Sequence, residues 1–124
     1  MPGKILIVED DADYRELIGR VLEKAGYSVT SAPNGEEGLR RYAADAPDLV
    51  ILDGQLPDID GFEVCRRIRS QGPRPDTPIL FCTVRSAVSP VAEGLRSGGT
   101  DYILKPFEIA DLLQRVRSAL ASAK

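Results

Sequence analysis

Five polar residues stand at or just after the ends of short apolar runs in this sequence. They are Glu9, Asp10, Asp53, Thr83 and Lys105. Short apolar runs bounded by polar residues are typical of strands that are buried in a parallel sheet. Because parallel strands present their carboxyl ends at one edge of a sheet, we expect the three carboxylates, the hydroxyl and the ammonium group to lie close together there.

Such a site has the chemistry of phosphoryl transfer. Mg²⁺ prefers oxygen ligands, binds one or two protein carboxylates and also accepts phosphate oxygens. Crowded carboxylates raise one another's pKa, whereas a bound cation leaves Asp53 ionised and able to attack a phosphorus atom. Lys105 and Thr83 would then stabilise the charge on the phosphoryl oxygens. The site is therefore predicted to form an aspartyl phosphate, with Mg²⁺, or alternatively Mn²⁺, as cofactor.

Each of these residues, taken alone, also has a purely structural explanation. Glu9, Asp10 and Asp11 would favour the positive N-terminal end of a helix that follows them. Asp53 could begin a turn, and Lys105 could be a solvated surface charge. These explanations leave the coincidence of five polar groups at matching strand ends unexplained.

Composition and size restrict the class of protein. The chain has 124 residues, of which 43% are hydrophobic and 28% are charged, as expected for a single globular domain covering residues 1–124. It contains no histidine, which excludes histidine-based general bases and most zinc sites. A net charge of −3 gives no indication of a nucleic-acid surface. Cys65 and Cys82 form no CxxC pair and are expected to be buried, reduced thiols.

The sequence shows no segment that would direct it to a membrane. No apolar run approaches the roughly 18 residues of a membrane span. The first ten residues, MPGKILIVED, do not resemble a signal peptide, because their short apolar run ends in acids. We therefore expect a cytoplasmic protein without membrane contact.

Segments with strand and helix patterns alternate along the chain. Strands are predicted at 4–8, 27–32, 49–52, 78–82 and 101–104. Helices are predicted at 11–25, from Asn34 onward, at 61–70, from Ser89 to the Gly98-Gly99 pair, and at 107–121. The periodic apolar residues that should face the core include Leu17, Ala43 and Ile109. Five nearly all-apolar strands alternating with five helices indicate an α/β fold, with a parallel sheet covered by helices on both faces.

The sequence resembles a response-regulator receiver domain of two-component signalling over nearly its whole length. The resemblance is carried by four stretches: ILIVEDD at 5–11, PDLVILDGQLPDIDGFEVCRRIR at 47–69, PILFCTV at 78–84 and GTDYILKPF at 99–107. It implies a doubly wound, flavodoxin-like, five-stranded sheet with the strand order 2-1-3-4-5, flanked by five helices.

The resemblance also implies a role for each acid of the site. Asp53 would accept a phosphoryl group from a partner histidine kinase or histidine phosphotransfer protein. Asp10 would bind Mg²⁺ directly and Glu9 through water, while the backbone carbonyl of Gln55 would complete the metal shell. Since the chain has no histidine, the phosphodonor is expected in a separate protein.

A second group of implied roles concerns switching. Thr83 and Lys105 would contact the phosphoryl oxygens, and the peptide bond between Lys105 and Pro106 would be cis. Tyr102 matches the family's switch aromatic, which turns inward when Thr83 moves toward the phosphate. The resulting change in the face formed by residues 84–106 would control an unidentified downstream partner or output domain. The chain would then be a signalling switch and not an enzyme.

Two positions depart from the family pattern. Gly54 replaces the larger residue that usually follows the nucleophile, which is expected to loosen the loop and open the site. Val84 stands where alanine or glycine is usual, and it would narrow access beside Thr83. Together they suggest an altered lifetime of the phosphorylated form. Asp58 and Asp60 are expected to serve the loop and the cap of the next helix, and not the metal.

Other functions are open alternatives. A receiver-like adaptor would bind a partner without phosphorylation, although such proteins usually lose an acid or the lysine. A metal-dependent phosphatase would use a second acid two residues after its nucleophile, where this chain has Gln55. A calcium-binding loop with Gly61 as its sixth residue would begin at Leu56 and end at Arg67, and neither fits. A flavodoxin-like cofactor site would need a phosphate-cradling loop in place of the acids after the first strand.

Overall fold

A parallel sheet of five strands forms the centre of the protein. The structure, a computed structural model, describes residues 3–72, 74–84 and 98–122. The strands are β1 (Lys4–Val8), β2 (Ser28–Ala32), β3 (Leu49–Leu52), β4 (Ile79–Val84) and β5 (Asp101–Lys105). They lie in the order β2-β1-β3-β4-β5 and every neighbouring pair is parallel, which confirms the predicted sheet.

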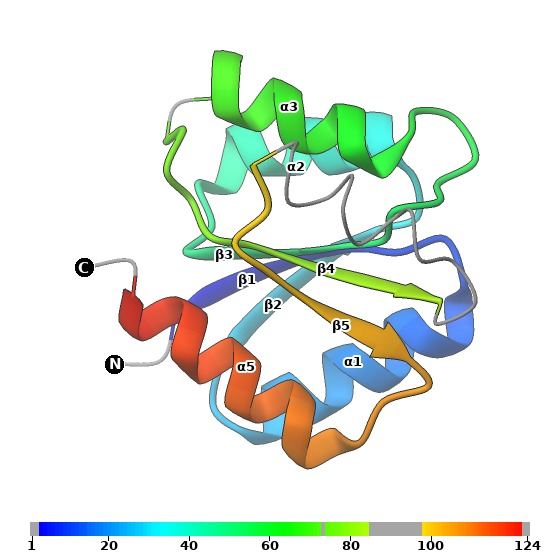
Figure 1. The fold of residues 1–124 in the computed structure, drawn as a ribbon, viewed down its shortest axis with the longest axis vertical. Helices are drawn as coiled ribbons and strands as arrows, with labels where there is room; N and C mark the ends of the chain where they lie inside the picture. Colours follow the sequence, from blue (N-terminus) through cyan, green and yellow to red (C-terminus); the bar gives the residue numbers. More distant parts are fainter. Residues whose placement is uncertain (1–2, 73, 85–97, 123–124) are drawn as a thin grey trace.

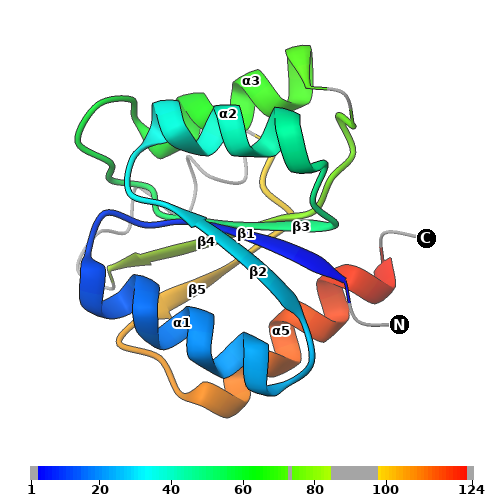
Figure 2. The same ribbon diagram turned by 180° about the vertical axis from the view of Figure 1, so that it is seen from behind.

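Helices cover both faces of the sheet. The described residues form α1 (Ala12–Lys24), α2 (Gly35–Asp45), α3 (Gly61–Gln71) and α5 (Ile109–Ser122). α1 and α5 lie on one face and α2 and α3 on the other (Figure 1), and Figure 2 shows the same two layers from behind. The helix predicted to begin at Ser89 falls in residues 85–97, outside the described residues. None of the helices in the described segments is long and apolar enough to cross a membrane.

Polar side chains fix the start of three helices. Asp11, Asn34 and Asp60 accept hydrogen bonds from backbone amides in the first turns of α1, α2 and α3, respectively. Such N-caps satisfy amide groups that have no partner inside the helix. The cap predicted at Asp60 is thereby confirmed, and α2 begins directly after Asn34, where a helix was predicted to start. After α1, Gly26 adopts a φ of 101°, a left-handed conformation that ends the helix at little steric cost.

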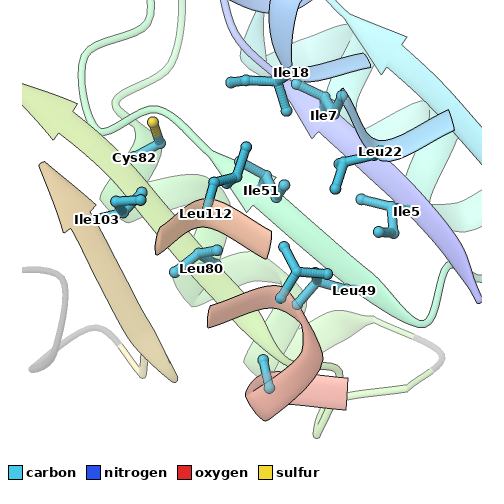
Figure 3. Packing of buried hydrophobic residues seen from close by; sticks show 12 residues of the cluster. Ile5, Ile7, Ile18, Leu22, Leu49, Ile51, Leu80, Cys82, Ile103 and Leu112 are labelled. Atoms are coloured by element: carbon cyan, nitrogen blue, oxygen red, sulfur yellow. The ribbon is translucent and has the colours of Figure 1, made fainter. Parts of the chain in front are cut away.

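Two layers of apolar side chains hold the helices against the sheet. The layer beneath α1 and α5 is drawn in Figure 3 and includes Ile5, Ile7, Ile18, Leu22, Leu49, Ile51, Leu80, Ile103 and Leu112. The layer beneath α2 and α3 includes Leu6, Val8, Tyr42, Val50, Leu52, Phe62, Val64, Ile68 and Phe81. Because alternate residues of a strand point to opposite faces, β3 is buried on both sides, as its all-apolar sequence predicts.

Three residues that the helical pattern assigned to the core are exposed instead. Ala43 directly follows the buried Tyr42 and so points about 100° away from it around α2. Leu17 directly precedes the buried Ile18 in α1, so it also points about 100° away from the buried side of its helix, and 40% of its surface is exposed. Ile109 is the first residue of α5, ahead of the buried part of that helix, and is 48% exposed.

The two cysteines are buried free thiols, as predicted. Burial raises the pKa of both Cys65 and Cys82, and that of Cys82 reaches about 12. Because the thiolate is the reactive form, neither side chain is activated at neutral pH.

α2 approaches β1 closely because a glycine lies between them. A Cβ atom at Gly38 would lie 2.8 Å from Cγ2 of Val8, which is closer than van der Waals contact permits. Val8 is the last residue of β1 and Glu9 follows it directly. This contact therefore helps to fix the end of the strand that carries the first acid of the site.

Gly38→Ala should lower the free energy of unfolding by about 1–3 kcal/mol, because the added methyl group overpacks α2 against Val8. Gly19→Ala is the matched control in α1, since its Cβ atom would lie 4.0 Å from its nearest neighbours. There the gain in helix propensity should raise stability by up to about 1 kcal/mol. Urea denaturation measures both changes. Equal effects of the two substitutions would contradict the close approach of α2 to β1.

Candidate functional site

The carboxyl ends of four neighbouring strands meet at one edge of the sheet, where the arrowheads of β4 and β5 point in Figure 1. β1 and β3 each end just before an acid, Glu9 and Asp53, whereas Thr83 and Lys105 lie near the ends of β4 and β5. The amide of Asp53 donates to the carbonyl of Val8 at 2.9 Å, which ties the end of β3 to that of β1. The chain reverses its direction of winding between these two strands, the usual position of ligand sites in open parallel sheets.

The three carboxylates predicted for the site lie together. Glu9, Asp10 and Asp53 each have one carboxylate oxygen within 4.8 Å of the others. Glu9 and Asp53 are buried, whereas Asp10 is exposed, so the cluster is open to solvent on the side of Asp10. A donor set made only of oxygens, with one accessible side, fits a hard divalent cation such as Mg²⁺.

Lys105 is the cation of this cluster. Its Nζ atom lies 2.7 Å from Oε1 of Glu9 and 3.5 Å from Oδ2 of Asp53. Only 7% of its side chain is exposed, so both ion pairs form largely away from water, where charges interact more strongly. The peptide bond between Lys105 and Pro106 is cis, as predicted.

Burial disfavours the charged forms of Glu9, Asp53 and Lys105. It raises the pKa of Glu9 from 4.5 to about 7, although the hydrogen bond and charge of Lys105 partly oppose this shift. It likewise raises the pKa of Asp53, although the hydrogen bond from the amide of Gln55 and the charge of Lys105 act to lower this pKa. For Lys105, burial acts to lower the pKa, but the two carboxylates outweigh it and raise the value. A cation bound to the acids would favour loss of the proton that this environment otherwise retains.

Thr83 brings a buried hydroxyl to the edge of the sheet. β4 continues past its predicted end at Cys82, so Thr83 lies within the strand and pairs with Leu104 of β5. Its Oγ1 atom is buried and has no hydrogen-bond partner in the part of the chain that the structure describes. A buried hydroxyl without a partner costs free energy, and an oxygen ligand bound beside it would remove that cost.

Hydrogen bonds to two acids hold the loop between β3 and α3. The amide of Gln55 donates to Oδ1 of Asp53 at 3.0 Å, while the Gln55 side chain is exposed. Asp58 accepts from the amides of Gly35 at 2.8 Å and Glu36 at 2.9 Å, so it caps the N-terminus of α2 across the loop. Asp58 therefore has a structural role, although its partner helix was not predicted. The backbone carbonyl of Gln55 as a metal ligand stays a prediction.

A phenylalanine ring fills the space beside the candidate nucleophile. A Cβ atom at Gly54 would lie 3.0 Å from Cζ of Phe62. Phe62 is buried, and its ring packs against Phe81 with 5.2 Å between the ring centres. The expectation that Gly54 opens the site is therefore wrong, because the Phe62 ring takes the place of a larger side chain there. Val84, the other residue that departs from the family pattern, is 38% exposed. An altered lifetime of the phosphorylated form stays a prediction.

Tyr102 is the aromatic residue predicted to act as the switch. It is half-buried in β5 and packs against the apolar layer beneath α2 and α3. The guanidinium carbon of Arg115 lies 5.7 Å from the centre of its ring. Arg115 also forms ion pairs with Asp101 at 3.1 Å and Asp111 at 3.2 Å. An inward turn of Tyr102 stays a prediction, since much of the 84–106 face is outside the described residues.

Two residues of α1 also contact the site, although the sequence did not single them out. The ring centre of Tyr14 lies 4.6 Å from Nζ of Lys105. The guanidinium group of Arg15 donates to the backbone carbonyls of Glu9 at 2.8 Å and Asp10 at 3.4 Å, which supports the segment between β1 and α1. The position of Tyr14, one turn before the buried Ile18, indicates that it lies on the core side of α1, but the sequence does not indicate its contact with Lys105. No local signal marks Arg15.

Comparison with known proteins identifies the family. The profile of the response regulator receiver domain matches residues 5–117 of this chain. The chain belongs to this family. The receiver domain is 48% identical over 120 residues to a response regulator MprA of Mycolicibacterium vanbaalenii, and 45% identical over 124 residues to one of Mycobacterium bovis. These matches cover 97% and 100% of the chain but 51% and 53% of the relatives, so the chain spans about half their length.

Solved receiver domains share the fold closely. A CheY-like response regulator receiver domain protein from Methanospirillum hungatei superimposes with a TM-score of 0.91 at 28% identity, covering 99% of this chain and 97% of that one. The BeF3-activated receiver domain of DrrB gives a TM-score of 0.87 at 35% identity, covering 98% and 99%. The chain is thus a receiver domain of two-component response regulators, and the alternative of a phosphorylation-independent adaptor is not favoured.

A larger side chain beside Asp53 should not fit while Phe62 is present. Gly54→Leu is expected to lower the free energy of unfolding by about 1–3 kcal/mol through overpacking. Adding Phe62→Leu to Gly54→Leu should recover most of this loss. Urea denaturation of the two single variants and the double variant measures the coupling, and purely additive effects would contradict contact between the two positions.

The pKa of Glu9 makes the stability of the metal-free receiver domain depend on pH. Because this pKa is about 7 in the folded protein and ordinarily 4.5, the folded state keeps a proton that the unfolded state loses between these values. The free energy of unfolding should therefore fall as the pH rises from about 4.5 to about 7, by up to about 3 kcal/mol from this group. Urea denaturation in EDTA across this range measures the fall. Glu9→Gln cannot titrate and should show a smaller one; an equal fall would assign the pH dependence to other groups.

Proposed function

We propose that Asp53 accepts a phosphoryl group from a phosphohistidine of a partner histidine kinase or histidine phosphotransfer protein. The observation that carries this proposal is the burial of Asp53 beside two further acids and Lys105 at the carboxyl edge of the sheet. A carboxylate nucleophile needs surroundings that keep it ionised and that neutralise the incoming phosphoryl group. An ammonium group and an oxygen-lined site for a cation meet both needs, and membership of the receiver family supports the assignment.

The transfer exchanges one bond to phosphorus for another. A carboxylate oxygen of Asp53 forms the new P–O bond as the P–N bond to the donor histidine breaks, and the electron pair of the broken bond returns to the imidazole nitrogen. Mg²⁺, or Mn²⁺, held by the three acids and the backbone carbonyl of Gln55, would neutralise charge on the phosphoryl oxygens. Asp53 must be ionised to attack, so it must have lost the proton that burial favours.

Two groups on neighbouring strands suit the phosphorylated state. The ammonium group of Lys105, now 3.5 Å from Oδ2 of Asp53, would donate to a phosphoryl oxygen. The buried hydroxyl of Thr83 would gain the acceptor that it lacks among the described residues. A shift of Thr83 would leave room for Tyr102 to turn inward, and the changed 84–106 face would pass the signal to a downstream partner or output domain.

The partners of this domain follow from the same chemistry. The 124 residues contain no histidine, so a phosphohistidine donor lies outside them. We propose that the domain acts in the cytoplasm as a switch that gains and loses its own phosphoryl group, and that it does not turn over a separate substrate. Its direct partners are then proteins.

Incubation with acetyl phosphate and Mg²⁺ should add the mass of one phosphoryl group to the intact protein. Asp53→Asn should abolish this gain, because an amide is not a nucleophile toward phosphorus, and EDTA should abolish it in the parent protein. Intact mass spectrometry measures both. An undiminished gain in Asp53→Asn would place the phosphoryl group elsewhere. A parent protein that gains no mass and binds neither Mg²⁺ nor beryllofluoride would favour the adaptor.

A further inference from the structure

We propose that Tyr14 is a positioning residue for Lys105, holding the lysine ammonium group against the face of its ring and directed at Asp53. This role rests on the proposed function, since it concerns the group that would neutralise the phosphoryl oxygens. α1 would then contribute a side chain to the site, in addition to following directly after the segment that holds Glu9 and Asp10.

The ammonium group of Lys105 lies between two acids and an aromatic ring. Nζ is 2.7 Å from Oε1 of Glu9, 3.5 Å from Oδ2 of Asp53 and 4.6 Å from the centre of the Tyr14 ring. A cation within about 6 Å of a ring centre is attracted by the negative face of the ring, and more strongly where water is excluded. Since only 7% of the Lys105 side chain is exposed, the ring covers a side of the ammonium group that water would otherwise solvate.

A ring face suits this position better than a third acid would. It attracts the positive charge without using one of the N–H donors of Lys105, which stay available for the carboxylates and for a phosphoryl oxygen. The attraction extends over the whole face of the ring. Nζ can therefore move from Glu9, now its nearer acid, toward a phosphoryl group on Asp53 without losing contact with Tyr14.

Tyr14 is itself held in place from several directions. Its amide donates to Oδ1 of the N-cap residue Asp11 at 3.1 Å, which fixes it in the first turn of α1. Its side chain is half-buried and packs against the apolar layer beneath α1 and α5. Its ring lies 5.8 Å from that of Phe107, centre to centre, and the two planes are inclined at 45°. Because Phe107 follows Lys105 by two residues, the contact between the Tyr14 and Phe107 rings also joins α1 to the end of β5.

Binding of beryllofluoride in the presence of Mg²⁺ tests this role without turnover. Tyr14→Leu removes the ring and should weaken beryllofluoride binding by about fivefold, which lies within the range expected for cation–π contacts. Phosphorylation by acetyl phosphate should slow by a similar factor. Tyr14→Phe keeps the ring face and should recover the affinity to within about twofold. Titrations followed by ¹H–¹⁵N NMR measure these affinities, and Tyr14→Met provides the same loss of the ring should Tyr14→Leu not fold.

A matched control and a spectroscopic signature separate positioning from general damage. Tyr27 is also half-buried against the layer beneath α1 and α5, but it lies just before β2, at the amino ends of the strands. Tyr27→Leu should therefore leave beryllofluoride binding unchanged, and Tyr14→Leu should leave Mg²⁺ binding unchanged. The Tyr14 ring should also shift the Hε resonances of Lys105 upfield, and this shift should vanish in Tyr14→Leu and persist in Tyr14→Phe.

Equal beryllofluoride affinity in Tyr14→Leu and the parent protein would overturn the proposal. So would a Tyr14→Phe variant as impaired as Tyr14→Leu, because the ring face would then not be the cause. Joint loss of Mg²⁺ and beryllofluoride binding in Tyr14→Leu, or an equal defect in Tyr27→Leu, would overturn it by showing a structural effect. If the parent protein binds no beryllofluoride and gains no phosphoryl group, it is the proposed function that fails, and the role of Tyr14 fails with it.

Discussion

One ammonium group is shared by two buried carboxylates in this receiver domain. Among the described residues, Glu9, Asp53 and Lys105 are the charged side chains that are buried, and one negative charge is left over when all three are ionised. Removing charges from water is unfavourable, and an unpaired charge is the most unfavourable of all. A proton or a cation relieves the imbalance. Because a phosphoryl group would add further negative charge, such a site can accept one only together with positive charge.

The fold holds this cluster from both faces of the sheet. On one face, Arg15 of α1 binds the backbone that carries the first two acids. On the other face, α3 starts directly against the backbone around Asp53, where the amide of Gly61 donates to the carbonyl of Gly54 at 3.2 Å. A side chain at Gly61 would collide with the carbonyl of Asp53, so a glycine is required there. Groups fixed to strand ends in this way keep their geometry better than groups on long loops.

The residues of the site could be predicted because each is marked by a local pattern. A polar residue at the end of an apolar run is visible in the sequence, and a parallel sheet brings strand ends together whatever the connecting loops do. Contacts between residues far apart in the chain leave no such mark. Examples are the cap that Asp58 gives to α2 and the Tyr14 ring over Lys105. The Phe62 ring beside Gly54, only eight residues away, is not indicated by a local pattern either. Periodicity also failed at helix ends and borders, as the exposed side chains of α1, α2 and α5 show.

The loop between β3 and α3 is fastened to two helices by two different acids. Asp58 binds the N-terminus of α2 and Asp60 binds that of α3, while the loop begins at Asp53 and ends at Asp60. Each cap requires its carboxylate at a fixed number of residues from the strand. An inserted or deleted residue would therefore release one helix or the other, so we expect this loop to diverge among relatives by substitution while its length stays constant.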